Sequence, residues 1–342
     1  MQKDPFKLHK LALAPFLESE QPVYFHYLLA EAEKEDSNDF LQFLIFNGLA
    51  ALWHEKISIA GQEQNIHPEF FEKLQQVRLT SEANYLMQKK TLQKIHETLT
   101  TASIEYVIFK GAQIRELIYE KPSLRPCTDI DVLVSKQNRN AAIHALSSAG
   151  MMYRTTNKFS HEAALIDGPV HIDLHSYVTN PSRMRIDISE SILRKSQNMK
   201  YFLGPSNEET LFILLVHPAF RKHVCNPYAL LIRTVDLLQF LKTQQVNWDS
   251  VIQHLNITGI KTAAWATMYW IRLLTNNEIL DEYMNRLKPN TIQRKYLELW
   301  IRNNLPTNLV NHRIIVWLMF SLALHDNVTD ALRFLYHGKS TS

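Results

Sequence analysis

The spacing of hydrophobic residues along this chain changes near residue 100 and again near residue 180. Up to about residue 100, apolar residues recur every three or four positions, which is typical of helices. Short apolar runs that predict strands follow, and helical spacing returns after about residue 180. We therefore expect a helical region at 1–100, a core with a sheet at 101–180 and a second helical region at 181–342.

The middle region predicts a small mixed β-sheet, and thus an α+β fold. Apolar runs at Ile104–Phe109 and Asp129–Val134 indicate two strands. A third strand is expected at Val170–Val178, where apolar and polar residues alternate. The Asp167-Gly168 pair before it is a hairpin signal, because aspartate and glycine suit the positive φ angles of tight turns.

Helices are expected to connect these strands and to flank the sheet. The spacing predicts helices at Ala112–Tyr119 and Gln137–Ser148. The segment Ser206–Glu209 is a capping box that predicts the start of another helix, and Pro218 is expected to end or kink it. The apolar run Ile314–Leu324 is expected to form a buried helix, since it is too short to cross a bilayer.

Composition limits the classes of protein to consider. The chain has 342 residues with 46% hydrophobic and 21% charged residues, which is ordinary for a folded protein of about two domains. Its net charge of +3 does not indicate a nucleic-acid surface, although it does not exclude one. Two cysteines without metal-site spacing, and an N-terminus without an apolar leader, predict a cytoplasmic protein without a membrane segment.

Carboxylates at alternate positions carry the strongest chemical signal. Asp129 and Asp131 are two residues apart on one strand, so both side chains leave the same face. Such a pair repels itself unless a cation lies between its members. The third strand presents Asp173 in the same way. Three carboxylates can hold one or two Mg²⁺ ions, and two ions suit an in-line displacement at phosphorus in which Asp173 takes the proton of the attacking hydroxyl.

Residues around the carboxylates complete a site for a phosphate-bearing ligand. Gly111 follows the first strand and would let the backbone approach a phosphate, while the next helix presents its N-terminal amides. Lys110 and Arg125 could add charge-assisted hydrogen bonds to the phosphate oxygens. His175 is expected to orient Asp173 from behind. Nucleotidyl transfer from an NTP is the chemistry that such a site would support.

The order of these motifs is similar to that of the nucleotidyltransferase superfamily that includes DNA polymerase beta, and more closely resembles a bacterial branch of uncharacterised nucleotidyltransferases. The resemblance rests on Lys110-Gly111, Arg125-Pro126, Thr128-Asp129-Ile130-Asp131 and Ile172-Asp173-Leu174-His175. It implies three metal-binding aspartates, Asp129, Asp131 and Asp173, with an NTP as donor. In most of the superfamily a Gly-Ser pair opens the helix, so the lysine and glycine found here depart from that pattern.

Several alternatives remain open at this point. His171, Asp173 and His175 could form a separate transition-metal site, since imidazoles and a carboxylate suit iron or zinc. Arg233 and Asp236 share a helix face, which more often serves packing than ligand binding. The leading hypothesis is an Mg²⁺-dependent nucleotidyltransferase acting on a hydroxyl of a small molecule, peptide or protein. The alternatives are an inactive nucleotide-binding or protein-interaction module, and a tRNA-directed transferase of toxin type.

Overall fold

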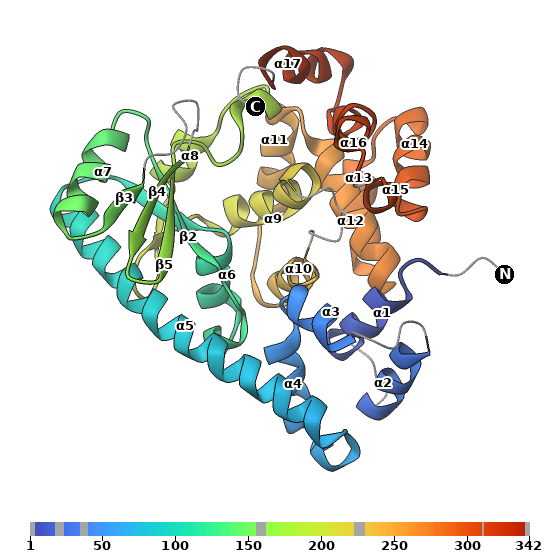
Figure 1. The fold of residues 1–342 in the computed structure, drawn as a ribbon. Coiled ribbons are helices and arrows are strands. Elements are labelled where there is room, and N and C mark those ends of the chain that lie inside the picture. The colour runs from blue at the N-terminus through green and yellow to red at the C-terminus, as the bar shows by residue number, and fades with distance from the viewer. Residues whose placement is uncertain are drawn as a thin grey trace.

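A mixed sheet with helical regions before and after it forms the centre of the molecule, as the sequence predicted (Figure 1). The computed structural model describes residues 4–17, 24–34, 40–154, 162–221, 230–309 and 311–338. Cys225 lies outside the described residues. In Figure 1 the helices α9 (Asn207–Arg221) and α10 (Ile232–Thr243) lie between the sheet and the C-terminal helices.

The sheet has five strands in the order β1-β2-β5-β4-β3, where β2 and β5 are parallel and the other neighbours are antiparallel. Its strands are β1 (Tyr106–Phe109), β2 (Asp129–Val134), β3 (Met152–Arg154), β4 (Glu162–Asp167) and β5 (Val170–His175). The short strands β6 (Gln197–Asn198) and β7 (Leu203–Gly204) form a separate pair. The parallel β2–β5 pair lies inside the sheet, with β1 on one side and β4 on the other.

The predicted strands occur, with shorter bounds in two cases. The strand Asp129–Val134 is confirmed at both ends. The first strand begins at Tyr106 rather than Ile104, and the third ends at His175 rather than Val178. The hairpin between β4 and β5 is confirmed, and Gly168 has a φ of +58° there, which explains the glycine.

The helices fall into three groups along the chain. The N-terminal helices are α1 (Lys7–Leu13), α2 (Phe25–Glu33), α3 (Phe40–Phe46), α4 (Ala50–Ile59) and α5 (Pro68–Thr101). Within the sheet region lie α6 (Gly111–Ile118) and α7 (Arg139–Ser148). The later helices, besides α9 and α10, are α8 (Ser189–Arg194), α11 (Trp248–Thr258), α12 (Lys261–Thr275), α13 (Ile279–Leu287), α14 (Thr291–Arg302), α15 (Leu305–Asn308), α16 (Arg313–Val316) and α17 (Val328–Gly338).

The predictions about two later helical segments had different outcomes. The capping box is present, because the backbone N–H of Glu209 donates to Ser206 Oγ at 3.3 Å, yet α9 continues through Pro218 to Arg221. The run Ile314–Leu324 does not form a single buried helix: it divides into α16, a π-helical turn and a 3₁₀ turn, and Ile314 is 74% exposed. The apolar spacing of the run did not reveal this division, because only part of the run faces the core.

The two faces of the sheet pack against different parts of the chain. Ile130, Val132 and Val134 of β2 point into a cluster shared with Leu92 and Leu99 of α5, as the alternation predicted. Leu133 points the other way, into a larger cluster built from both the N-terminal and the C-terminal helices. The odd-numbered positions of β2 therefore face the side where these two helical regions meet.

Within the described part of the chain, no helix combines the length and the apolar character needed to cross a membrane. The longest helix, α5, has 34 residues and carries many charged residues along its surface. The apolar character of α12 reflects packing inside the protein, since twelve of its fifteen residues are buried.

The half-buried histidine of α1, His9, makes the stability of the N-terminal region sensitive to pH. His9 packs edge-on against Phe6, Phe43 and Trp270, and its Nδ1 is buried without a hydrogen-bond partner among the described residues. Burial lowers the pKa of His9 from 6.5 to about 4, because it disfavours the charged imidazolium, and the nearby Asp4 offsets this only in part.

We expect acid to destabilise the fold through His9. The folded state binds this proton more weakly than the unfolded state, so the stabilisation is complete above about pH 6.5 and is lost as the pH falls towards 4. Between about pH 7 and pH 5 the loss should be on the order of 1–2 kcal/mol. Urea unfolding of the wild type and of His9→Phe at both pH values measures it. The variant should lose less stability, whereas His144→Phe, at an exposed helix position, should behave as the wild type.

Candidate active site

The parallel pairing of β2 with β5 brings two of the predicted aspartates together. Asp131 and Asp173 are direct partners in the strand register, so both side chains leave the sheet on the same face at the same level. Asp131, Asp173 and His175 each offer one ligand atom, and these atoms all lie within 4.8 Å of one another. Asp131 and His175 are buried and Asp173 is half-buried. The site therefore lies in the middle of the β2–β5 ladder, and Asp173 is its most accessible member.

Asp129 lies two residues before Asp131 on the same strand but outside this close group. It is half-buried, its register partner is His171, and its Oδ1 accepts a hydrogen bond from Thr128 Oγ1 at 3.0 Å. His171 is exposed and also lies outside the group, so the structure does not gather His171, Asp173 and His175 into one metal site. Asp129 remains on the correct face for a ligand that extends along β2.

Asp131 is held as a carboxylate by two nitrogen donors. Lys110 Nζ lies 2.5 Å from Asp131 Oδ1, and His175 Nε2 lies 2.7 Å from the same oxygen. Burial alone would raise the pKa of Asp131, but the Lys110 ammonium and the His175 hydrogen bond outweigh it and lower the pKa to about 2. Both contacts fall on Oδ1, and no donor among the described residues reaches Oδ2. That oxygen is left for another ligand.

Lys110 reaches Asp131 from an unusual backbone conformation. Its φ is +57° and its ψ is −133°, a region that residues other than glycine rarely adopt, and it lies at the N-terminal cap of α6. The Lys110 ammonium lies 4.5 Å from the centre of the Phe109 ring and 3.4 Å from His175 Nε2. Strain of this kind persists only where the surroundings fix it, and here it places a positive charge next to the carboxylates.

Gly111 is required by space rather than by its φ angle. A Cβ at this position would lie 2.6 Å from Arg125 Nη1 and 2.8 Å from Cys127 Sγ, both too close for any side chain. Arg125 thus lies directly against the turn that begins α6. The buried Cys127 thiol has a raised pKa, because burial disfavours the thiolate, and it donates to the backbone oxygen of Asp129. Cys127 is therefore an unreactive part of the wall of the site.

Arg125 is bound to a carboxylate that lies 111 residues away in the sequence. Its Nη2 donates to Asp236 Oδ2 at 2.7 Å and its Nε donates to Asp236 Oδ1 at 3.3 Å, while the hydroxyl of Tyr119 donates to Oδ1 at 2.8 Å. Burial of the Arg125 guanidinium would lower its pKa, but the carboxylate raises it overall. This buried pair fixes α10 against the turn of Lys110 and Gly111. The sequence had placed Arg125 only as a phosphate ligand.

The chemistry of the donor set fits a divalent cation. Asp131 and Asp173 supply hard oxygen ligands side by side, and the lowered pKa of Asp131 keeps it ionised at any physiological pH. The imidazole of His175 already contacts Asp131 and so serves to orient it. The Lys110 ammonium shows that this carboxylate accepts a cation at hydrogen-bond distance. Asp131 and Asp173, with Asp129 beside them, are the residues that would hold the metal.

Comparison with known families agrees with this geometry. A family model described as an uncharacterised nucleotidyltransferase matches residues 33–276. The chain belongs to this nucleotidyltransferase family. No curated protein matches the sequence.

The match extends well beyond the sheet of this nucleotidyltransferase. It includes α3, α4 and α5 before the sheet, and it ends after α12, so it covers the helices that pack on both sides of the active-site face. The pair of Arg125 and Asp236 lies wholly within it. The helices α9 and α10 are therefore part of the family's shared unit.

Proposed function

We propose that the chain is an Mg²⁺-dependent nucleotidyltransferase that moves an NMP group from an NTP to a hydroxyl of a small molecule, a peptide or a protein. The observation that carries the proposal is the side-by-side placement of Asp131 and Asp173 at the same level of two parallel strands. Family membership supports nucleotidyl transfer in general. The modest net charge of +3 favours an acceptor other than bulk nucleic acid.

Each residue of the site has a definite task in this proposal. Asp129, Asp131 and Asp173 hold the metal, which when bound supplies positive charge to the phosphates of the donor. The amides that begin α6 at Gly111 face the triphosphate, since helix N-termini favour anions. Lys110 adds a positive charge within reach of both the carboxylates and the phosphates.

The transfer itself is a single displacement at phosphorus. The acceptor oxygen forms a bond to the α-phosphorus, and the bond from the α-phosphorus to the oxygen shared with the β-phosphate breaks, so pyrophosphate leaves. The carboxylate of Asp173 takes the proton of the attacking hydroxyl and later releases it to water. His175 keeps the neighbouring Asp131 in place through its 2.7 Å contact. Asp173 is the less buried of the two paired aspartates, which suits a group that must meet the acceptor.

Two measurements test the proposed function. Thermal unfolding with ATP, GTP, CTP or UTP, each with and without Mg²⁺, should show stabilisation by at least one nucleotide only when the metal is present. Incubation with that nucleotide in a cell extract should then transfer label from the α-phosphate but not from the γ-phosphate. Transfer of the γ-label would show a kinase instead, and no Mg²⁺-dependent nucleotide binding would favour an inactive protein-interaction module.

A further inference from the structure

Arg233 on α10 is a half-buried cation whose guanidinium is partly enclosed by the protein. Its Nη1 is buried, and no hydrogen bond or ion pair of its side chain occurs among the described residues. Burying a guanidinium without a partner costs free energy, so such groups are rare unless a ligand completes them. Burial and the neighbouring Arg125 lower the pKa of Arg233 to about 10, while Asp236, Asp131 and Asp129 act in the opposite direction. Arg233 is thus within electrostatic range of the active-site carboxylates.

The nearest carboxylate cannot serve as the partner of Arg233. Asp236 lies one helical turn further along α10, but its two oxygens already accept three hydrogen bonds from Arg125 and Tyr119. Arg125 and Arg233 therefore lie near each other, and both carry a positive charge. Asp236 neutralises Arg125, but no carboxylate among the described residues pairs with Arg233. An anion is what this arrangement lacks.

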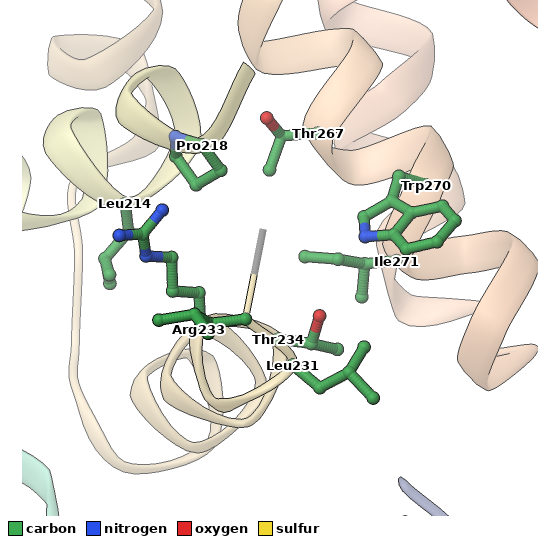
Figure 2. Close-up of a pocket in the computed structure, with 9 residues that line it drawn as sticks. Leu214, Pro218, Leu231, Arg233, Thr234, Thr267, Trp270 and Ile271 are labelled. Atoms are coloured by element: carbon green, nitrogen blue, oxygen red, sulfur yellow. The ribbon is translucent and has the colours of Figure 1, made fainter. Parts of the chain in front are cut away.

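The small hollow beside Arg233 cannot hold that anion. It lies between α9, α10 and α12 and is lined mainly by apolar side chains, with Arg233 and Thr267 on its walls (Figure 2). Its free volume of about 10 Å³ is about the space of one water molecule, which can serve the buried Thr267 hydroxyl. In Figure 2 the Arg233 side chain extends from α10 toward α9, and its guanidinium lies beside Leu214.

The active site is also close to Arg233, because α10 contacts α6 and the carboxylates of Asp131 and Asp129 act electrostatically on Arg233. The Arg125–Asp236 pair holds α10 against the turn at Gly111, and contacts between α10 and α6 place the two helices side by side. A triphosphate that begins at the metal-binding carboxylates and passes the amides of α6 therefore runs toward α10. Its terminal phosphates carry the charge that would neutralise Arg233, whose fork of N–H groups suits phosphate oxygens.

We propose that Arg233 binds the triphosphate of the donor nucleotide through its β- and γ-phosphates. This role rests on the proposed nucleotidyl transfer and adds to it a residue from the C-terminal helical region. Arg233 would then also neutralise pyrophosphate as that group leaves, because the negative charge on the β-phosphate rises when its bond to the α-phosphorus breaks.

Binding and stability, measured together, test the role of Arg233. Arg233→Met keeps the length of the side chain but removes the charge. It should weaken the binding of Mg²⁺-NTP and of tripolyphosphate roughly 10- to 100-fold, as expected for hydrogen bonds to a charged group. Binding of the matching NMP should not change. The melting temperature without ligand should stay the same or rise, because a partly buried charge without a partner among the described residues is removed.

Arg272→Met is the matched control. Arg272 also lies on a helix that lines the hollow, but its Nε donates to Asp281 at 2.9 Å, so its charge is already neutralised. This variant should bind nucleotide as the wild type does. If Arg233→Met fails to fold, Arg233→Lys replaces it and should still lose at least about threefold in affinity, because lysine lacks the planar fork.

The outcomes separate this inference from the proposed function. Wild-type affinity for Mg²⁺-NTP in Arg233→Met would overturn the role of Arg233 and leave nucleotidyl transfer intact. A fall of several degrees in the melting temperature, with the affinity unchanged, would show that Arg233 serves packing alone. That result would also overturn its proposed role in binding the triphosphate. A wild-type protein that binds neither an NTP nor tripolyphosphate would contradict the proposed function itself.

Discussion

Replacement of Asp131 by asparagine should lower nucleotidyl transfer at least about 10³-fold, by analogy with the loss of a single charge-stabilising group at other active sites. Asp131 is the most buried of the three aspartates proposed to bind the metal, and its carboxylate is held in the ionised form by Lys110 and His175. An amide has nearly the same shape but no charge. It would leave the Lys110 ammonium without its counter-ion and take one oxygen ligand from the metal.

Label transfer from an α-labelled NTP measures this effect. Asp167→Asn is the matched control, because Asp167 is also a strand aspartate whose pKa is lowered by a lysine, Lys94, at 2.7 Å. It lies at the β4–β5 hairpin, and its loss should leave transfer unchanged while costing a small amount of stability. If Asp131→Asn still transfers label at more than about a tenth of the wild-type rate, the metal site proposed around it is wrong.

Replacement of Asp236 by alanine should be the most destabilising single change in the site, with a loss of about 3–5 kcal/mol in the free energy of unfolding. Asp236 is 1% exposed, and its removal would leave the buried Arg125 guanidinium without a counter-charge. The hydroxyl of Tyr119 would lose its acceptor too. The effect comes from the orphaned charge rather than from the attraction of the pair as such.

Urea unfolding of Asp236→Ala compared with Asp249→Ala checks this. Asp249 also pairs with an arginine, Arg286, but its side chain is 84% exposed, so its loss should cost no more than about 1 kcal/mol. A double replacement, Arg125→Met with Asp236→Leu, should recover much of the stability but not nucleotide binding. Equal losses for the two single alanine variants would show that burial does not set the strength of the Arg125 pair.

The local parts of the site could be predicted from the sequence because strand alternation is a local rule. The strand Asp129–Val134 and the hairpin before Val170 both follow from residues next to each other in the chain. The register of β2 with β5 could not be predicted, and it is what brings Asp131 opposite Asp173 and His175 beside them. Asp129 and Asp131 share a face as expected, but only Asp131 lies in the close group.

Long-range partners account for most of what the sequence did not show. Lys110 and Arg125 were expected as phosphate ligands, and whether they contact phosphate remains a prediction; the structure gives each a carboxylate partner. The pairing of Arg125 with Asp236 depends on how α10 packs, which no local pattern encodes. Gly111 was expected to let the backbone approach a phosphate, and the structure places the positive φ of this turn at Lys110 instead. The partner that a side chain contacts depends on the whole fold, whereas the periodicity of a helix or strand depends only on neighbouring residues.

The buried pair of Arg125 and Asp236 has a consequence for any attempt to work with a shortened protein. A fragment that stops after β5 would contain all three aspartates and the turn at Gly111, and would look like a minimal enzyme on paper. It would lack Asp236, the carboxylate that pairs with Arg125. The Arg125 guanidinium, which lies against Gly111, would then be free to bind another anion. Such a fragment should aggregate or bind phosphate unselectively. The smallest unit worth expressing therefore extends at least through α12.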